Sequence, residues 1–589
     1  MTKEEIASAL EEIATLLELK AENPFKIRAY TNAARSIEAW GASLSDLQNQ
    51  ETLEKVPGVG KTLAAKIKEL ATTGQLKFLV DLRAEFPPTI LELFALPGLG
   101  AKKIKVLYDK LHVSSLAELE KACVTGRVAE LPGFGAATQT RLIQAIANRA
   151  KHAGIFQLGQ IAPEAERLRA DLAAHPEVLQ LSIAGSFRRR KETVRDLDFI
   201  VASPAPAEVT AFFCGHELVE SVIARGPTKT SVRLRSGIQS DLRVVTGAEY
   251  PFALSYFTGS KEHNISMRNR ALERGWTLNE YRLAPAPRRG EEAGKTRRQT
   301  LPLPEVREEA DLYHAVGLAY IPPELRENQG EFEAAANDQL PRLLELENLR
   351  GTFHCHTTAS DGHDSLEAMV QGARELGLEY LGIADHSHSQ VQAHGLDADR
   401  LRAQGAQIRQ LNAEVDGIHL WSGAEVDIRR DGSLDFPDEV LAELDFVVAS
   451  VHGTLTLTEA QMTERVIRAM SNPLVTMLAH PTGRLLLKRE AYPIDLAAVI
   501  EAAAETGTWI EINSAPKRLD LDWRWWPLAK AKGVRCVINP DAHRVSRLSD
   551  LWFGVGVARK GWLMKEDVVN TLPFAQMEKE LRRKRQAAR

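Results

Sequence analysis

Two carboxylates lie one residue apart where a polar stretch enters an apolar run, at Asp196 and Asp198. Alternate residues of a β-strand face the same side, so a strand that begins here would hold both carboxylates side by side. Like charges at that distance repel each other unless a cation lies between them, and such oxygen ligands suit Mg²⁺. A third acid, Asp241, lies in another expected strand, 240–245, whose hairpin partner is 231–235. Three such acids could bind two metal ions, although an isolated Asp-x-Asp is more often only a strand that follows a polar turn.

A turn suited to phosphate precedes these acids. Gly185 and Ser186 end a short apolar run, and three arginines follow at 188–190. Backbone N–H groups in such a turn, together with arginine side chains, bind phosphate groups. A phosphate site beside a divalent metal site indicates phosphoryl or nucleotidyl transfer.

These segments, with the motif Tyr-Phe-Thr-Gly-Ser at 256–260 and Asn264 and Arg268 after it, resemble the family X DNA polymerases, the group that contains polymerase beta. The resemblance implies Mg²⁺ or Mn²⁺ bound by the three acids, with Asp241 also at the place of the base that activates the primer 3′-hydroxyl. It further implies a dNTP site made of Gly185, Ser186, Arg189, Tyr256, Phe257, Gly259, Asn264 and Arg268. In that site Ser186 and Arg189 hold the triphosphate, and Arg268 contacts the template strand.

One residue departs from the family pattern. Gln239 lies two residues before Asp241, where the animal enzymes carry an arginine. Asp241 would therefore lack a neighbouring cation. This difference keeps open an alternative in which the polymerase part is too slow to matter and the chain is mainly a nuclease.

A Pro-Gly-x-Gly sequence occurs three times between expected helices, at 57–60, 97–100 and 132–135. Glycines permit a tight hairpin and expose N–H groups at the start of the second helix, which can bind a DNA backbone phosphate without reading sequence. The three copies resemble helix-hairpin-helix elements. We expect DNA contacts at Gly58, Gly60, Gly98, Gly100, Gly133 and Gly135, with an architectural role left open for the third copy.

The first 80 residues resemble the amino-terminal domain of polymerase beta. Lys66 matches the lysine that forms a Schiff base with a 5′-deoxyribose phosphate, and Lys26 and Tyr30 match residues near the 5′-phosphate of a gapped strand. Such a lysine must be partly neutral, through burial or neighbouring cations. An ordinary solvated helix lysine is an equal alternative.

From residue 351 onward, metal-binding side chains recur after short apolar runs. They are His354, His356, Asp361, His386, Glu425, His452, His480, Asp541 and His543. The segments between them have helical patterns, and alternating strands and helices predict a parallel barrel in which the carboxyl ends of the strands converge. Nine such ligands could hold several Zn²⁺, Mn²⁺ or Fe²⁺ ions.

This pattern resembles the PHP domain, the polymerase and histidinol phosphatase family, which is a distorted seven-stranded β/α barrel with three divalent metals. The resemblance assigns His354, His356, Glu425 and Asp541 to the first metal, Asp361, His386 and His543 to the second, and Glu425, His452 and His480 to the third. His363 falls outside the set. Clustered metals would activate a water molecule to attack a phosphodiester.

The combination resembles the bacterial family X polymerases, in which the PHP site performs Mn²⁺-dependent 3′–5′ exonuclease cleavage. An abasic endonuclease or 3′-phosphodiesterase activity is a further expectation. The substrate would be gapped or nicked double-stranded DNA in a repair pathway of the base excision type. A DNA-binding scaffold without activity is the alternative, but a scaffold needs neither three acids nor nine metal ligands.

The chain of 589 residues is long enough for several domains. We expect a helical lyase-like domain at 1–80, helix-hairpin-helix fingers at 81–150, an α+β nucleotidyltransferase palm at 151–245, a thumb at 246–320, a linker at 321–348 and the PHP barrel at 349–589. A stretch rich in Arg, Pro and Glu, 284–305, predicts a flexible loop.

We expect a monomeric enzyme of the cytoplasm that associates with the nucleoid. No apolar run approaches the length of a membrane span, and the four cysteines show no paired spacing. The net charge of −5 means that DNA must be bound at local basic patches rather than over the whole surface.

Overall fold

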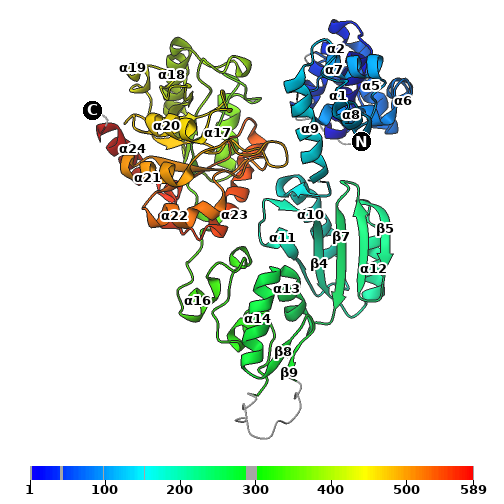
Figure 1. Cartoon of the computed structure of the whole chain (residues 1–589), viewed down its shortest axis with the longest axis vertical. Coiled ribbons are helices and arrows are strands. Elements are labelled where there is room, and N and C mark those ends of the chain that lie inside the picture. Colours follow the sequence, from blue (N-terminus) through cyan, green and yellow to red (C-terminus); the bar gives the residue numbers. More distant parts are fainter. Residues whose placement is uncertain are drawn as a thin grey trace. The chain divides into compact units, whose positions relative to one another are not determined.

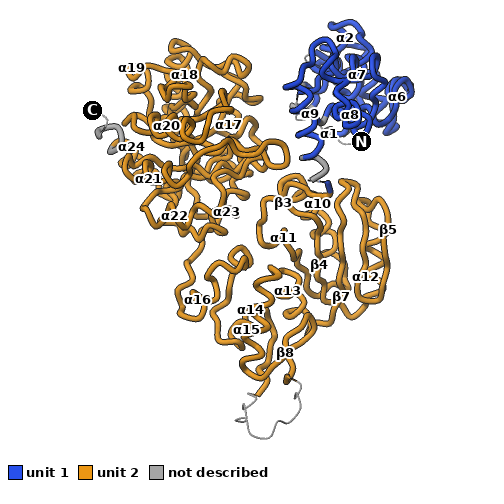
Figure 2. Tube along the Cα trace, viewed as in Figure 1, with its two compact units in different colours: residues 1–153 blue, residues 154–589 orange. Residues whose placement is uncertain are grey.

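The computed structural model describes residues 3–39, 44–56, 58–96, 98–151, 153–286 and 302–587. The chain divides into two compact units, residues 1–153 and 154–589 (Figure 2). Pro57 and Pro97 of the expected hairpins and most of the expected loop, 287–301, lie outside the described residues.

The described part of the first unit is helical. Its helices are α1 (Lys3–Leu19), α2 (Pro24–Ala39), α3 (Leu44–Leu47), α4 (Gln50–Leu53), α5 (Lys61–Thr73), α6 (Lys77–Ala84), the 3-10 helix η1 (Pro88–Ala95), α7 (Ala101–Leu111), α8 (Leu116–Val124) and α9 (Ala136–Lys151). In α1 the residues Ile6, Leu10, Ile13 and Leu17 follow the spacing of one helix face, and all four are buried in the core of the unit.

The second unit begins with the expected palm, a five-stranded sheet in the order β2-β4-β7-β6-β5 (Figure 1). The strands are β2 (Gln180–Ile183), β4 (Asp196–Ala202), β5 (Val219–Arg225), β6 (Lys229–Leu234) and β7 (Gln239–Val245), and a separate pair joins β1 (Phe156–Gln157) to β3 (Thr193–Val194). Strands β4 and β7 are parallel, whereas the other neighbours in the sheet are antiparallel. The palm helices are α10 (Leu158–Ala173), α11 (Gly185–Arg188) and α12 (Pro206–Gly215).

The expected thumb follows. It contains α13 (Tyr250–Thr258), α14 (Lys261–Glu273), β8 (Trp276–Leu278), β9 (Leu283–Pro285) and α15 (Glu309–Ala315). The expected linker after it contains η2 (Pro323–Leu325), α16 (Glu331–Ala336) and η3 (Leu346–Asn348). The segment 321–348, expected as a linker, is not an open connection. It contributes Leu325, Ala335 and Leu343 to the same buried cluster as Trp276 and Tyr313 of the thumb, because its apolar residues can be buried there.

The last part is a parallel seven-stranded sheet whose strands are paired in chain order. They are β10 (Gly351–Thr352), β11 (Tyr380–Ile383), β12 (His419–Asp427), β13 (Phe446–Ser450), β14 (Met477–Leu478), β15 (Trp509–Asn513) and β16 (Cys536–Asn539). The first and last strands are joined through a side chain, since Asn539 Oδ1 accepts hydrogen bonds from Thr352 Oγ1 and Phe353 N, each at 3.0 Å. The sheet is therefore a nearly closed barrel, which confirms the expected distorted seven-stranded architecture.

Helices surround this barrel (Figure 1). They are α17 (Leu366–Glu375), η4 (Val391–Ala393), α18 (Ala398–Glu414), α19 (Asp438–Leu441), α20 (Glu459–Met470), α21 (Leu496–Thr506), η5 (Trp523–Trp525), α22 (Trp526–Ala531), η6 (Val545–Asp550), α23 (Leu551–Lys560), η7 (Lys565–Asp567), η8 (Val569–Thr571) and α24 (Phe574–Ala587). Short strands with helices between them bring the carboxyl ends of all seven strands to one edge.

Candidate metal centres and DNA contacts

The three palm acids lie together on two parallel strands. Asp198 of β4 is the direct partner of Asp241 on β7, and Asp196 is two residues earlier on the same strand, opposite Gln239. Partners in a parallel pair share a face, so the three carboxylates point to one side of the sheet. The structure thus brings together the three residues that the sequence proposes as metal ligands.

Their environment opposes ionisation of Asp196 and Asp198. Burial raises the pKa of Asp198 to about 7, and the neighbouring Asp196 and Asp241 act in the same direction. The pKa of Asp196 is also raised, first by desolvation and then by Asp241. A divalent cation would offset this repulsion, so the donor set fits a hard metal ion such as Mg²⁺ or Mn²⁺.

Asp241 has a cationic neighbour that the sequence did not reveal. Lys229 of β6 places its Nζ 2.6 Å from Asp241 Oδ2, and Gln239 Nε2 donates to Oδ1 at 3.0 Å. Burial opposes ionisation of Asp241, but hydrogen bonds from Lys229, Ser231 and Gln239 outweigh it and lower the pKa. The register explains the contact, since Ser231 is paired with Asp241 and Lys229 lies two residues away on the same strand.

The expected phosphate turn is the short helix α11, in contact with the acids. Gly185 has φ +62°, and a Cβ at this position would lie 2.8 Å from Asp198 Oδ2, so both the backbone and the space require glycine. Arg189 contacts the segment that carries Tyr256, Phe257 and Gly259 of the expected dNTP site. Its Nη1 donates to the Thr258 carbonyl, and its Nε lies 3.1 Å from Glu327 Oε1. Ser186, half-buried, lies on α11 itself.

The remaining expected dNTP residues lie on α13 and α14. Tyr256 and Phe257 pack edge to face with ring centres 5.1 Å apart, and Gly259 follows two residues after Phe257. Asn264 Nδ2 donates to the Tyr256 carbonyl at 2.7 Å, and the exposed Arg268 donates from Nε to the Asn264 carbonyl at 3.3 Å. Hydrogen bonds to backbone carbonyls therefore connect Arg268 to Asn264 and Asn264 to Tyr256.

In the first unit the three hairpins share one backbone geometry. In each, the residue between the two glycines donates its N–H to the carbonyl three residues earlier, at 3.0 Å for Val59, 3.2 Å for Leu99 and 3.0 Å for Phe134. The first glycine of each copy has positive φ: Gly58, Gly98 and Gly133. The second glycine, Gly60, Gly100 or Gly135, precedes the next helix directly. The glycine pattern thus makes three equivalent turns, each with free space at the start of a helix.

The side chain of Lys66 on α5 contacts two aromatic side chains, Tyr30 and Phe78. Its Nζ donates to the Tyr30 hydroxyl and lies 3.4 Å from the centre of the Phe78 ring. Burial lowers the pKa of Lys66, and the positive charge of Lys26 lowers it further. Lys66, Tyr30 and Lys26, proposed separately from the sequence, therefore form one cluster, and Lys66 is not an ordinary solvated lysine.

All nine expected ligands of the barrel meet at the carboxyl ends of its strands. Glu425 of β12 is central, because ring nitrogens of five histidines lie close to its carboxylate: His386 at 2.9 Å, His480 at 2.9 Å, His452 at 3.2 Å, His354 at 3.3 Å and His356 at 3.6 Å. Asp541 Oδ1 lies 3.4 Å from His356 Nε2 and 3.6 Å from His543 Nδ1.

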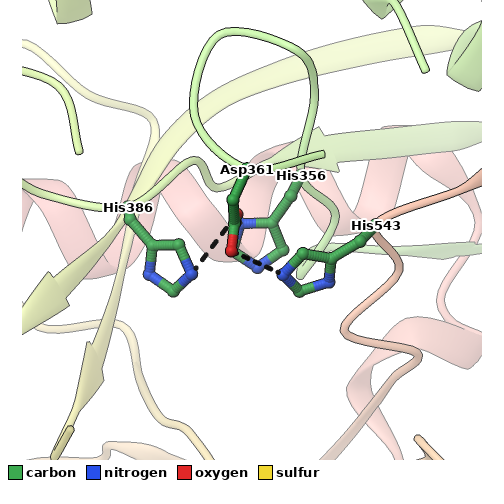
Figure 3. Close-up of side chains that lie close together, drawn as sticks. All are labelled: His356, Asp361, His386 and His543. Carbon is green, nitrogen blue, oxygen red and sulfur yellow. Dashed lines mark ion pairs between the residues drawn. The ribbon is translucent and has the colours of Figure 1, made fainter. Parts of the chain in front are cut away.

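The donor atoms form three groups compact enough to hold an ion. One contains His356, Asp361, His386 and His543, the second His354, His356 and Asp541, and the third His386, Glu425 and His452. Figure 3 shows Asp361 between His386 and His543, at 3.6 Å and 3.4 Å. These groups overlap with the three ligand sets expected from the resemblance, but His356 and His386 are each shared between two groups. His480 is in none of the three groups, and its Nε2 lies 2.9 Å from Glu425 Oε1.

The donors themselves indicate bound cations. Among the described residues, Nε2 of His354 and both ring nitrogens of His356 are buried without a hydrogen-bond partner. An unsatisfied buried polar atom costs roughly 1–3 kcal/mol. Burial lowers the pKa of His356, as do the neighbouring His543 and His386, so this imidazole is neutral, which is the form that binds a metal. The residues present therefore fit divalent metals.

Two outer carboxylates orient these histidines and were missed from the sequence. Glu511 Oε1 lies 2.7 Å from His354 Nδ1, and Asp427 Oδ1 lies 2.7 Å from His452 Nδ1. A carboxylate on the second ring nitrogen fixes the tautomer of a metal-binding histidine. Asp427 lies on β12 two residues after Glu425, and Glu511 lies within the apolar run that forms β15, so their position was a usable signal. His363 lies beside the centre and donates its backbone N–H to the His543 carbonyl at 2.7 Å.

A similar protein spans the whole chain. The DNA polymerase/3'-5' exonuclease PolX of Bacillus subtilis (strain 168) is 39% identical over 585 residues, which cover 99% of this chain and 100% of that protein. The chain belongs to the PolX family. In this PolX chain, family models match a helix-hairpin-helix domain at 1–76, a SAM-like helix-hairpin-helix tandem at 90–148, a DNA polymerase beta thumb at 253–327 and a PHP domain at 352–515.

Two bacterial proteins match a smaller part of this PolX chain. A probable phosphatase of Caldanaerobacter subterraneus subsp. tengcongensis is 30% identical over 204 residues, 32% of the chain and 74% of the phosphatase. A probable phosphatase of Caldicellulosiruptor saccharolyticus is 33% identical over 206 residues, 32% of the chain and 78% of the phosphatase. Among the described helices, none combines the length and the apolar character needed to cross a membrane.

Proposed function

We propose that this PolX chain is a DNA-directed DNA polymerase that fills short gaps and a 3′–5′ exonuclease that trims 3′ ends at a separate centre. The observation that carries the proposal is that one chain holds two groups of cation-binding side chains. They are the three acids on β4 and β7 and the nine expected ligands of the barrel, with Glu425 at their centre. The whole-length similarity to a DNA polymerase/3'-5' exonuclease supports both halves.

In the palm, the side chains would bind the metal ions and the dNTP and orient them toward the primer. Asp196, Asp198 and Asp241 would hold Mg²⁺ or Mn²⁺ against the triphosphate, with Asp241 facing the primer 3′-hydroxyl. Arg189 and the N–H groups of α11 would bind the phosphates of a dNTP. When bound, the metal ions supply charge neutralisation and lower the pKa of the attacking oxygen.

In the barrel, the nine ligands would hold three divalent ions, Mn²⁺, Zn²⁺ or Fe²⁺, and position the scissile phosphodiester. Glu511 and Asp427 keep His354 and His452 in the orientation that binding requires. We propose gapped or nicked duplex DNA as the substrate, a role in base excision repair with abasic-endonuclease or 3′-phosphodiesterase cleavage as a further reaction, and a monomeric enzyme.

One assay separates the two activities. A duplex with a single-nucleotide gap and a 5′-labelled primer is incubated with Mn²⁺, with and without dNTPs. The unaltered protein extends the primer by one nucleotide with dNTPs and shortens it without them. Asp198→Asn abolishes extension and keeps trimming, whereas His354→Asn abolishes trimming and keeps extension. Asp399→Asn, whose side chain is 97% exposed, is the matched control.

The outcomes distinguish the alternatives. Loss of both activities in either variant, with an unchanged circular dichroism spectrum, contradicts two separate sites. Shortening without extension by the unaltered protein favours a chain that is mainly a nuclease, and DNA binding without any product favours a scaffold.

Lys66 supports a third activity, removal of a 5′-deoxyribose phosphate through a Schiff base. The lowered pKa of Lys66 and its contact with Tyr30 favour this second candidate function. Borohydride should trap the unaltered protein on a nicked abasic duplex, and Lys66→Ala should prevent trapping. Lys68→Ala, an exposed lysine of the same helix, is the matched control. Trapping that persists in Lys66→Ala excludes Lys66 as the nucleophile.

A further inference from the structure

A groove of about 600 Å³ opens beside the barrel centre. Asp361, Asp541 and His543 of the expected metal ligands line its inner part, so whatever enters the groove reaches the metal-binding side chains. Its outer part is made by residues that neither the metal ligands nor the polymerase site account for.

One wall of the groove comes from the palm. Gly159 and Gln160 of α10 line it, together with Gln157 directly before that helix. A Cβ on Gly159 would lie 2.1 Å from Pro516 Cβ, so α10 packs directly on the loop after β15, and Gln157 Nε2 donates to the Leu486 carbonyl at 2.7 Å. The centre of the barrel is therefore bordered by two parts of the chain that are far apart in the sequence.

The groove is also lined by basic side chains. Among the described residues that line the groove, the charged side chains besides Asp361 and Asp541 are three cations, Lys517, Arg544 and Arg547, and the carboxylate of Asp550. Lys517 and Arg547 are exposed, and Arg547 Nη1 lies 3.7 Å from Asp550 Oδ2, so Arg547 also has an acidic neighbour within the groove. In a chain of net charge −5, three cations at the mouth of one metal-binding groove indicate an anionic ligand that extends beyond the reacting group.

We infer that this groove binds the sugar-phosphate backbone of the DNA strand whose 3′ end lies at the barrel centre. Lys517 and Arg547 contact phosphates of the nucleotides next to the scissile bond, and the exposed Gln160 of the palm contacts the same strand from the other side. Arg518 lies deeper, with Nε 3.4 Å from Asp541 Oδ2, and takes no part in this outer contact. The nuclease site is thus a composite of palm and barrel. The inference rests on the proposed exonuclease function.

Kinetics with two substrates test it. Lys517→Ala, Arg547→Ala, the double variant and Gln160→Ala are compared on a single-stranded oligothymidylate and on bis(p-nitrophenyl) phosphate, a diester too small to reach the outer groove. We expect the double variant to raise KM for the oligonucleotide at least tenfold, to change kcat little and to leave cleavage of the small diester unchanged. The dependence of log(kcat/KM) on log salt concentration should become flatter by about 1.4, because each phosphate contact on a single strand contributes about 0.7. Lys565→Ala, an exposed lysine outside the groove, is the matched control.

A second measurement needs no catalysis. An oligonucleotide with 4-thiothymidine second from its 3′ end is irradiated with protein freed of metal by EDTA, and cross-linked peptides are mapped. Peptides that contain Gln160 or Lys517 support the groove, and cross-links that fall entirely elsewhere overturn it. Variants that cleave the oligonucleotide with an unchanged KM and salt slope overturn the inference alone. Failure of the unaltered protein to cleave either substrate overturns the proposed nuclease function as well.

Discussion

At the scale of single residues, Lys229 compensates for the glutamine before Asp241. Its ammonium group lies 2.6 Å from Asp241 Oδ2, on the carboxylate that Gln239 also contacts. A hydrogen bond to a charged group contributes about 1.5–3 kcal/mol, which corresponds to a factor of roughly 10 to 100 in rate or affinity. Lys229 on β6 thus supplies Asp241 with a neighbouring positive charge, which in the animal enzymes comes from an arginine two residues before the acid.

Replacing this lysine should slow the polymerase specifically. We expect Lys229→Met to lower the single-turnover rate of nucleotide insertion about tenfold or more, and Lys229→Arg to restore most of it, while trimming of 3′ ends stays unchanged. Arg233→Met, on the same strand, controls for loss of a positive charge. Insertion by Lys229→Met at the rate of the unaltered protein would show that Asp241 needs no cation from β6.

Lys26 raises the fraction of Lys66 that is neutral and therefore reactive, because its charge lowers the pKa of Lys66. Burial and the charge of Lys26 both lower the pKa of Lys66, so removing that charge must raise the pKa again and reduce the neutral amine near neutral pH. We expect Lys26→Ala to move the rise in Schiff-base formation to higher pH, measured by borohydride trapping in single turnover at saturating DNA. Lys26→Arg keeps the charge and should keep the profile. If both variants show the same profile as the unaltered protein, the shift in Lys66 arises from burial alone.

At the scale of elements, the second glycine of each hairpin allows a clean test of phosphate binding. A Cβ on Gly60, Gly100 or Gly135 meets nothing within 4 Å, so alanine fits the fold but adds a methyl group where a phosphate would approach. We expect Gly60→Ala and Gly100→Ala to weaken binding to a gapped duplex roughly tenfold, measured by fluorescence anisotropy, with little change in melting temperature.

Two further glycine-to-alanine variants serve as comparisons, one in the third hairpin and one outside the hairpins. Gly135→Ala should leave affinity unchanged if its hairpin is architectural, and Gly215→Ala in the palm, which also meets nothing within 4 Å, controls for the added methyl group. Equal affinities throughout would mean that DNA binds elsewhere on the first unit.

Much of this arrangement could be predicted from the sequence because it depends on local patterns. The repeated glycines, the Asp-x-Asp strand and the ligands after successive strands each follow from spacing within a few residues. Contacts set by register and by long-range packing could not be predicted. Lys229 reaches Asp241 only because β6 pairs with β7 in one register, and Glu511 meets His354 across the barrel. The burial of Leu325, Ala335 and Leu343 in the thumb cluster likewise depends on the shape of the thumb, which no local pattern encodes.

At the scale of the whole second unit, one carboxylate connects the palm turn, the thumb segment and the barrel. Glu327 Oε1 lies 3.1 Å from Arg189 Nε and 2.9 Å from Lys560 Nζ, and Lys560 also donates to the Arg189 carbonyl at 3.0 Å. The Lys560 side chain is fully buried on α23. An expected triphosphate ligand is therefore held through Glu327 by a lysine of the barrel part.

Neutralising that carboxylate should affect both stability and nucleotide binding. Glu327→Gln leaves Arg189 and Lys560 as neighbouring cations without their anion, and breaking a buried pair costs about 3–5 kcal/mol. We expect a lower melting temperature and weaker dNTP binding, seen as a raised Michaelis constant for dNTP, while the exonuclease kinetics stay unchanged. In the double variant Glu327→Gln/Lys560→Met one of the two unpaired charges is gone, so stability should recover in part. Binding of dNTP should stay weak, because Arg189 still lacks Glu327. The single variant Lys560→Met completes the comparison. If the loss of stability in the double variant equals the sum of the losses in Glu327→Gln and Lys560→Met, Glu327 and Lys560 are not energetically coupled.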